Sequence, residues 1–110
     1  KDALTNLLSN SIKYRHPLRP LRCIFSMKAN GKWVEISVAD NGIGVPISDR
    51  KRIFERFVRV EGNNRGFAGG HGLGLAFVSE TANAHKGTVK CLDGIQGGTR
   101  FVLRLPVINS

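Results

Sequence analysis

Residues 2–14 carry two asparagines and a lysine at the spacing of one helix face. At 100° per residue, Asn6, Asn10 and Lys13 share a stripe about 60° wide. Asparagine has a low helix propensity, so glutamate or lysine would solvate this face at lower cost. An amide oxygen can bind magnesium, and an ammonium group can bind phosphate. A neutral amide holds the ion weakly, so this chemistry requires magnesium to arrive with phosphates. A solvated polar face also accounts for each residue singly.

A second candidate site is "DNGIG", residues 40–44, directly after a strand-like segment. The carboxylate of Asp40 can accept a hydrogen bond from an exocyclic amine such as that of adenine. Gly42 and Gly44 leave room for a ring to approach the backbone. An Asx turn with glycine at positive φ explains the same residues, so the motif alone does not decide between a binding site and a turn.

The third candidate is "GGHGLGLA", residues 69–76. It follows a loop rather than a strand, which argues against a dinucleotide fingerprint, and it lacks the Lys-Ser or Lys-Thr of a Walker loop. Glycines at the start of a helix expose N–H groups that suit phosphate oxygens. A flexible loop that meets a buried helix is the simpler alternative.

The sequence pattern predicts the elements that position these motifs. The first helix buries Leu4, Leu7, Leu8 and Ile12, and it ends before Pro17 and Pro20. Asn30 and Gly31 suit a tight hairpin turn. The predicted strands are 22–29, 33–39, 88–92 and 99–105. A short helix is predicted at 48–57, capped by Ser48 or Asp49. A loop covers 58–71, and a further helix runs from 72 and ends near Gly87. This order indicates helices on one face of a mixed or antiparallel sheet.

Length and composition favour one globular domain. The chain has 110 residues, 41% of them hydrophobic, with no apolar run that could span a membrane and no signal pattern at its start. Its net charge of +9 favours anionic partners. The basic residues lack interleaved aromatic residues, which argues against nucleic acid. Cys23 and Cys91 are expected to be small reduced core residues of a cytosolic protein, although a disulfide between neighbouring strands stays open.

Taken together and in this order, the motifs resemble the ATP-binding catalytic domain of bacterial two-component sensor histidine kinases, in the superfamily that includes gyrase B, Hsp90 and MutL. The resemblance rests on the Asn-bearing helix, "DNGIG", "IFERF", "GHGLGL" and "GGTRF". It implies an α+β fold of the Bergerat type, a two-layer α/β sandwich. In it, a mixed, mostly antiparallel sheet carries about three helices on one face. One domain would cover 1–110 with a mobile ATP lid at about 58–71, without the strand that usually precedes the first helix.

The resemblance also implies site residues. Asn10 looks like the magnesium ligand, Asp40 like the acceptor for the adenine amine, and Phe54 and Phe57 like the F box. Arg59 begins the lid, and Gly98 and Thr99 match the closing segment. The residues that match ATP contacts are Asn10, Lys13, Tyr14, Asp40, Gly42, Gly44, Gly70, Gly72, Leu73, Gly74, Leu75 and Thr99. Two residues depart from the pattern: Ser11 stands where Ala is common, and His71 replaces a small residue.

The residue at position 6 helps to choose the reaction. In the water-splitting relatives a Glu at this place acts as general base, and Asn6 cannot accept a proton in that way. The resemblance therefore implies transfer of the γ-phosphoryl group of Mg²⁺-ATP to a histidine, with Asn6, Lys13 and Arg59 as catalytic residues. None of His16, His71 and His85 has the acidic neighbour of the phosphorylated histidine in these kinases, so we expect the acceptor on a separate dimerisation domain.

Further expectations concern partners and alternatives. A response regulator receiver domain would take the phosphoryl group next. The domain itself is expected in the cytoplasm, without nucleic acid or membrane contact, although the parent protein could be membrane-anchored. Two alternatives stay open: a pseudokinase or regulatory interaction module with the same fold, and an ATPase of the gyrase type, against which Asn6 argues.

Overall fold

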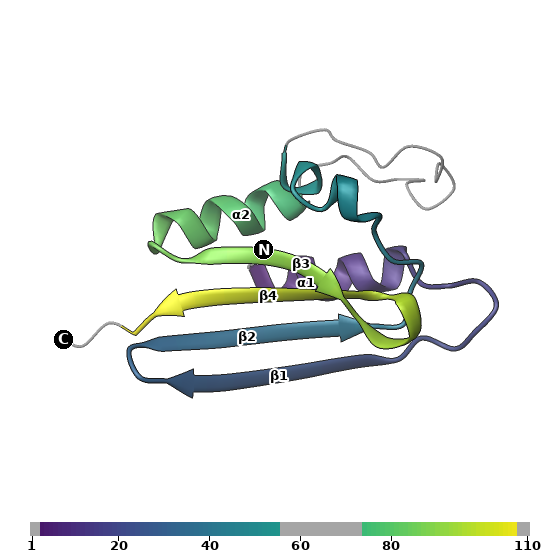
Figure 1. The fold of residues 1–110 in the computed structure, drawn as a ribbon, viewed down its shortest axis with the longest axis horizontal. Helices are drawn as coiled ribbons and strands as arrows, with labels where there is room; N and C mark the ends of the chain where they lie inside the picture. The colour runs from purple at the N-terminus through teal and green to yellow at the C-terminus, as the bar shows by residue number, and fades with distance from the viewer. Residues whose placement is uncertain (1–2, 56–73, 108–110) are drawn as a thin grey trace.

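The computed structural model describes residues 3–55 and 74–107 (Figure 1). Four strands form one sheet in the order β1-β2-β4-β3, and every neighbouring pair is antiparallel. The strands are β1 (Cys23–Asn30), β2 (Trp33–Asp40), β3 (Thr88–Asp93) and β4 (Thr99–Pro106). The predicted strands are thus confirmed to within a residue, and the expected sheet is antiparallel among the described residues.

Two α-helices, α1 (Ala3–Lys13) and α2 (Gly74–Ala84), pack on the same face of this sheet. The register places Val38, Phe101 and Cys91 in one row across β2, β4 and β3. Leu7 of α1 and Val78 of α2 belong to the same fully buried cluster as that row. The two-layer α+β architecture is therefore confirmed.

Strand β2 is buried more completely than its alternating pattern predicts. Ser37 and Ala39 lie on the face away from the helices, yet they are only 9% and 2% exposed. Ala39 is paired with Ile24 on one side and Arg100 on the other. Small side chains in a central strand are shielded by longer neighbours, so this half of β2 is buried on both faces.

The buried face of α1 differs from the predicted one. Ala3, Leu7 and Ser11 are buried at a spacing of four residues, whereas Leu8 and Ile12 are 38% and 53% exposed. The helix packs chiefly against α2, with its small residues turned inward. Hydrophobicity alone therefore assigned Leu8 and Ile12 to the wrong side of this helix.

Two local predictions are also wrong in detail. Where a helix was expected at 48–57, the described part contains two 3₁₀ turns, Ile47–Asp49 and Arg52–Phe54, without a side-chain cap. Asp49 instead accepts a hydrogen bond from Arg52 at 2.8 Å, so its carboxylate does not cap the turn. In the first hairpin Asn30 is still paired in β1, and the turn consists of Gly31, with φ of 63°, and Lys32.

The two cysteines lie in the outer strands β1 and β3, so a disulfide between neighbouring strands is excluded, and both are free thiols. Cys91 is buried as expected, but Cys23 is exposed. The whole of β1 is exposed, as expected of an uncovered sheet edge. No helix in the described ranges is long and apolar enough to cross a membrane.

Candidate functional site

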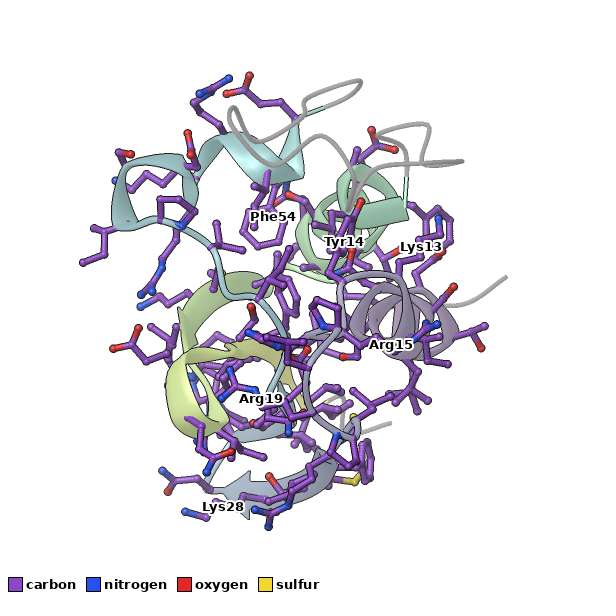
Figure 2. The ribbon with its side chains drawn as sticks, turned by 90° about the vertical axis from the view of Figure 1, so that its right-hand side faces the viewer. Lys13, Tyr14, Arg15, Arg19, Lys28 and Phe54 are labelled. Atoms are coloured by element: carbon purple, nitrogen blue, oxygen red, sulfur yellow. The ribbon has the colours of Figure 1, made fainter. Side chains whose placement is uncertain are left out.

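The predicted site segments meet at one end of the sheet, on the right in Figure 1. The end of α1, the end of β2, the start of α2 and the β3–β4 connection all lie there. Figure 2 views this end directly and shows Lys13, Tyr14 and Phe54 in its upper half, with Arg19 below them. The antiparallel sheet thus gathers motifs that are far apart in the sequence.

Asp40 is the buried acid of this end, at 4% exposed. Its Oδ1 accepts hydrogen bonds from the backbone N–H of Gly42 at 2.9 Å and of Thr99 at 3.2 Å. Its Oδ2 accepts a hydrogen bond from the hydroxyl of Ser11 at 2.8 Å. The contact with Gly42 is therefore an Asx turn, as one of the two interpretations predicted. Oδ2 takes no part in that turn.

Glycines allow the backbones around Asp40 to come into contact. A Cβ on Gly42 would lie 2.5 Å from the carbonyl oxygen of Tyr14 at the end of α1. A Cβ on Gly98 would overlap the carbonyl oxygen of Asp40. Gly44 has φ of 78°, and a side chain there would overlap the carbonyl of Gly97. Each glycine is therefore required by a specific close approach.

The polar stripe of α1 lies beside this turn. Asn6, Asn10 and Tyr14 are half-buried and Lys13 is exposed. A Cβ on Gly74, the first residue of α2, would lie 3.5 Å from Oδ1 of Asn6. Within this stripe, Asn6 therefore lies against the start of α2.

Phe54 anchors the segment that leads out of the glycine turn. Its ring meets that of Phe101 edge to face, with centroids 6.1 Å apart. Arg50 fastens the same segment, since its Nε donates to the carbonyl of Val45 at 3.0 Å and its Nη2 lies 2.6 Å from Asp93. Phe54, which the resemblance matched to the F box, is thus partly buried and packs against the core.

Several predicted residues lie outside the described ranges: Phe57, Arg59, Gly70, His71, Gly72, Leu73 and the lid at about 58–71. Leu75, which is described, packs against the core from α2. No group of three His, Cys, Asp or Glu side chains able to hold a metal occurs among the residues that the structure describes.

Sequence reasoning missed two residues that build the site. Asn41 is 2% exposed and joins the loop after α1 to the glycine turn, with Oδ1 accepting from the N–H of Arg22 at 2.8 Å and Nδ2 donating to Pro20 at 2.9 Å. The other is Ser11, whose bond to Asp40 the sequence could not indicate. The sequence placed Asn41 within the "DNGIG" motif and marked Ser11 as a departure from the family pattern, but it indicated the contacts of neither residue.

The surface beside the site is cationic. A depression of about 500 Å³ follows the loop after α1, and its lining includes Lys13, Arg15, His16 and Arg19 but no acidic residue. The field of these groups attracts anions toward the end of α1.

The thiol of Cys23 lies close to both Ser11 and Asp40. Although Cys23 is exposed as a residue, partial burial of its thiol raises the pKa; a hydrogen bond with Ser11 opposes this increase, and the nearby charge of Asp40 adds to it. Ser11, Cys23 and Asp40 therefore form one cluster at the junction of α1, β1 and β2.

Comparison with known proteins identifies the family of this chain. Residues 1–109 match the family described as histidine kinase-, DNA gyrase B- and HSP90-like ATPase. The chain is 42% identical over 106 residues to the sensor-like histidine kinase SenX3 of Mycobacterium tuberculosis, covering 96% of this chain and 25% of that protein. It is 34% identical over 110 residues to the sensor protein RprX of Bacteroides fragilis, covering 99% of this chain and 21% of that protein. The chain thus spans about a quarter of the length of these relatives or less.

Solved structures show the same fold. The ATP-binding domain of PrrB from Mycobacterium tuberculosis superposes with a TM-score of 0.72 at 34% identity, covering 97% of this chain and 65% of that one. Full-length ShkA in complex with AMPPNP superposes with a TM-score of 0.79 at 32% identity, covering 98% of this chain and 21% of that one. The chain therefore belongs to the histidine kinase-, DNA gyrase B- and HSP90-like ATPase family, as a domain similar to those of sensor histidine kinases.

Proposed function

We propose that this chain binds Mg²⁺-ATP and donates its γ-phosphoryl group to a histidine on a separate dimerisation domain of the same parent protein. The observation that carries this proposal is the buried carboxylate of Asp40, which is oriented by three donors and keeps acceptor capacity on Oδ2. A buried acceptor at the edge of a glycine turn suits the exocyclic amine of adenine. Gly42 and Gly44 bring the backbone of this turn against Tyr14 and Gly97, which holds the turn in place around the carboxylate.

The phosphates would lie between α1 and the start of α2. Lys13 and Tyr14 would contact them from the end of α1, and backbone N–H groups at the start of α2 would favour negative charge. Asn10 offers an amide oxygen as a magnesium ligand from the same stripe. A single neutral amide holds Mg²⁺ weakly, so the ion would come bound to the triphosphate, where it neutralises charge during phosphoryl transfer.

We infer a histidine acceptor, rather than water, because the residue at position 6 is an amide and not a general base. Asn6 faces the start of α2 where a general base for water would stand, and an amide does not take up a proton. A neutral imidazole already carries an attacking lone pair, so the protein mainly has to position it. The described histidines are engaged locally, with Nδ1 of His16 accepting from the N–H of Leu18 and that of His85 contacting the carbonyl of Thr81.

The remaining roles follow from the same proposal. Arg59, Gly70, Gly72 and Leu73 would complete the phosphate site from the lid and the second glycine motif. A response regulator receiver domain would accept the phosphoryl group from the histidine. Residues 1–110 would form one catalytic domain that works in the cytoplasm, where ATP is available, as part of a longer parent protein.

Calorimetric titration of the chain with Mg²⁺-ATP tests the site. We expect Asp40→Asn and Asn10→Ala each to weaken binding by about 1–3 kcal/mol, the range for removing a hydrogen bond to a charged group or ion. Asp49→Asn and Asn83→Ala are matched controls, because Asp49 pairs with Arg52 and Asn83 lies exposed on α2. Unchanged affinity in both site variants would refute the assignment.

A further inference from the structure

Ser11 is buried at the point where α1 meets the proposed base site. The residue is 1% exposed, and its hydroxyl oxygen lies 2.8 Å from Oδ2 of Asp40 but 3.4 Å from the carbonyl oxygen of Leu7. A serine within a helix commonly donates to the carbonyl four residues earlier. Here the shorter contact is to the carboxylate, which is also the stronger acceptor. The hydroxyl proton is therefore directed to Asp40 rather than to Leu7.

The acceptor capacity of Asp40 can then be counted. A carboxylate has about four lone-pair positions. Gly42 and Thr99 use those on Oδ1, and Ser11 uses one on Oδ2. The remaining lone pair is on Oδ2, the oxygen that accepts from Ser11. The hydrogen bond from Ser11 therefore determines the direction of this lone pair.

We propose that Ser11 is a base-recognition residue, which orients Oδ2 of Asp40 toward the exocyclic amine of adenine and so contributes to nucleotide specificity. The inference rests on the proposed function, because it takes Asp40 as the anchor of the base. Because the hydroxyl proton of Ser11 is donated to Asp40, the hydroxyl and the carboxylate both present only lone pairs toward the base. A 6-amino purine matches this edge, whereas the carbonyl oxygen of a 6-oxo purine meets acceptors without a donor.

A loss of ATP affinity on removing this hydroxyl would not arise from a weakened helix. Alanine has the highest helix propensity, and Ser11→Ala removes a single oxygen atom. Asp40 keeps both backbone donors on Oδ1 in this variant. The expected change is therefore confined to the direction and order of Oδ2.

The test combines the variant with a base analogue in one cycle of calorimetric titrations. The intact chain and Ser11→Ala are titrated with Mg²⁺-ATP and with the Mg²⁺ complex of purine riboside triphosphate, which lacks the 6-amino group. We expect Ser11→Ala to weaken ATP binding about three- to tenfold, the range for one oriented hydrogen bond, and to leave binding of the analogue unchanged. Ser11→Cys fills the same space with a weak donor and should match the alanine variant. Ser9→Ala, exposed on the same helix, should match the unaltered chain.

The outcomes separate this inference from the proposed function. An equal loss for both nucleotides would mean that Ser11 acts on the fold and not on the base, and would overturn the inference. Unchanged ATP affinity in Ser11→Ala, together with a loss in Asp40→Asn, would overturn it as well but leave the ATP site standing. If the unaltered chain did not bind ATP, the proposed function itself would fall.

Discussion

At the scale of single residues, the two thiols show how much the environment of a residue type matters. Cys91 lies in the core at 7% exposed, and burial raises the pKa of its thiol to about 11. Cys23 is exposed at the other edge of the sheet, beside Ser11 and Asp40. The reactive species of a cysteine is its thiolate, so burial and a raised pKa both suppress the reaction of Cys91.

We therefore expect iodoacetamide at pH 8 to modify Cys23 in the folded chain and to leave Cys91 unmodified. The measurement is peptide mass spectrometry after timed alkylation, with a urea-unfolded sample as the control in which both thiols react. Because Cys23 adjoins the carboxylate proposed to hold the base, Mg²⁺-ATP should slow its alkylation. Rapid modification of Cys91 in the native chain would contradict its placement in the core.

At the scale of elements, the site depends on backbone contacts between the glycine turn after β2 and the β3–β4 connection. Gly94 and Gly98 both approach the carbonyl oxygen of Asp40. A Cβ on Gly94 would lie 2.6 Å from that oxygen, and one on Gly98 would overlap it. The packing of these two connections, rather than any one side chain, fixes the position of Asp40 in the site.

Gly98→Ala should therefore destabilise the fold by about 1–3 kcal/mol, because the methyl group must displace the backbone of Asp40. Urea unfolding measures this cost, and calorimetry should show weaker Mg²⁺-ATP binding in the same variant. Gly31→Ala is the matched control, since Gly31 has φ of 63° in the first hairpin and no atom within 4 Å of its added methyl group. We expect it to cost about 1–2 kcal/mol from backbone conformation alone and to leave ATP affinity unchanged. Equal effects of both variants on binding would argue against a role for the Gly98 contact.

At the scale of the whole molecule, the acid proposed to anchor the base and part of the proposed phosphate site lie at one end, and the described histidines make local backbone contacts. Its net charge of +9 favours association with anions such as a nucleotide triphosphate. The outer strand β1 and the side chains of Leu8 and Ile12 are exposed, so one flank of the domain is not covered by the described residues.

Phosphoryl transfer should therefore require a second domain. With radiolabelled Mg²⁺-ATP we expect little label on the chain alone, and an acid-labile phosphohistidine on the dimerisation domain of the parent protein when both are mixed. Asp40→Asn should slow the transfer in line with its loss of ATP affinity. Label on the chain itself, at His16 or His85, would contradict an acceptor on a separate domain, and no transfer at saturating ATP would favour a regulatory module.

Much of the fold was predictable because its signals are local. Alternation in β2 and β4 predicted strands that the structure confirms to within a residue, since hydrophobic periodicity reflects a buried face directly. The helix proposed at 48–57 failed because a short segment takes its form from its tertiary anchors. Here those anchors are the packing of Ile53 and Phe54 and the pairing of Arg50 with Asp93 of β3.

The sequence by itself determined the family and the candidate site residues, because residue types and their spacing along the chain are enough to identify motifs. Only the tertiary structure decided which side of α1 is buried and that Ser11 donates to Asp40, 29 residues away. Such contacts depend on the rotation of a helix and the register of strands. Both are determined by packing between residues that are distant in sequence. Periodicity within one element is not enough to fix either of them.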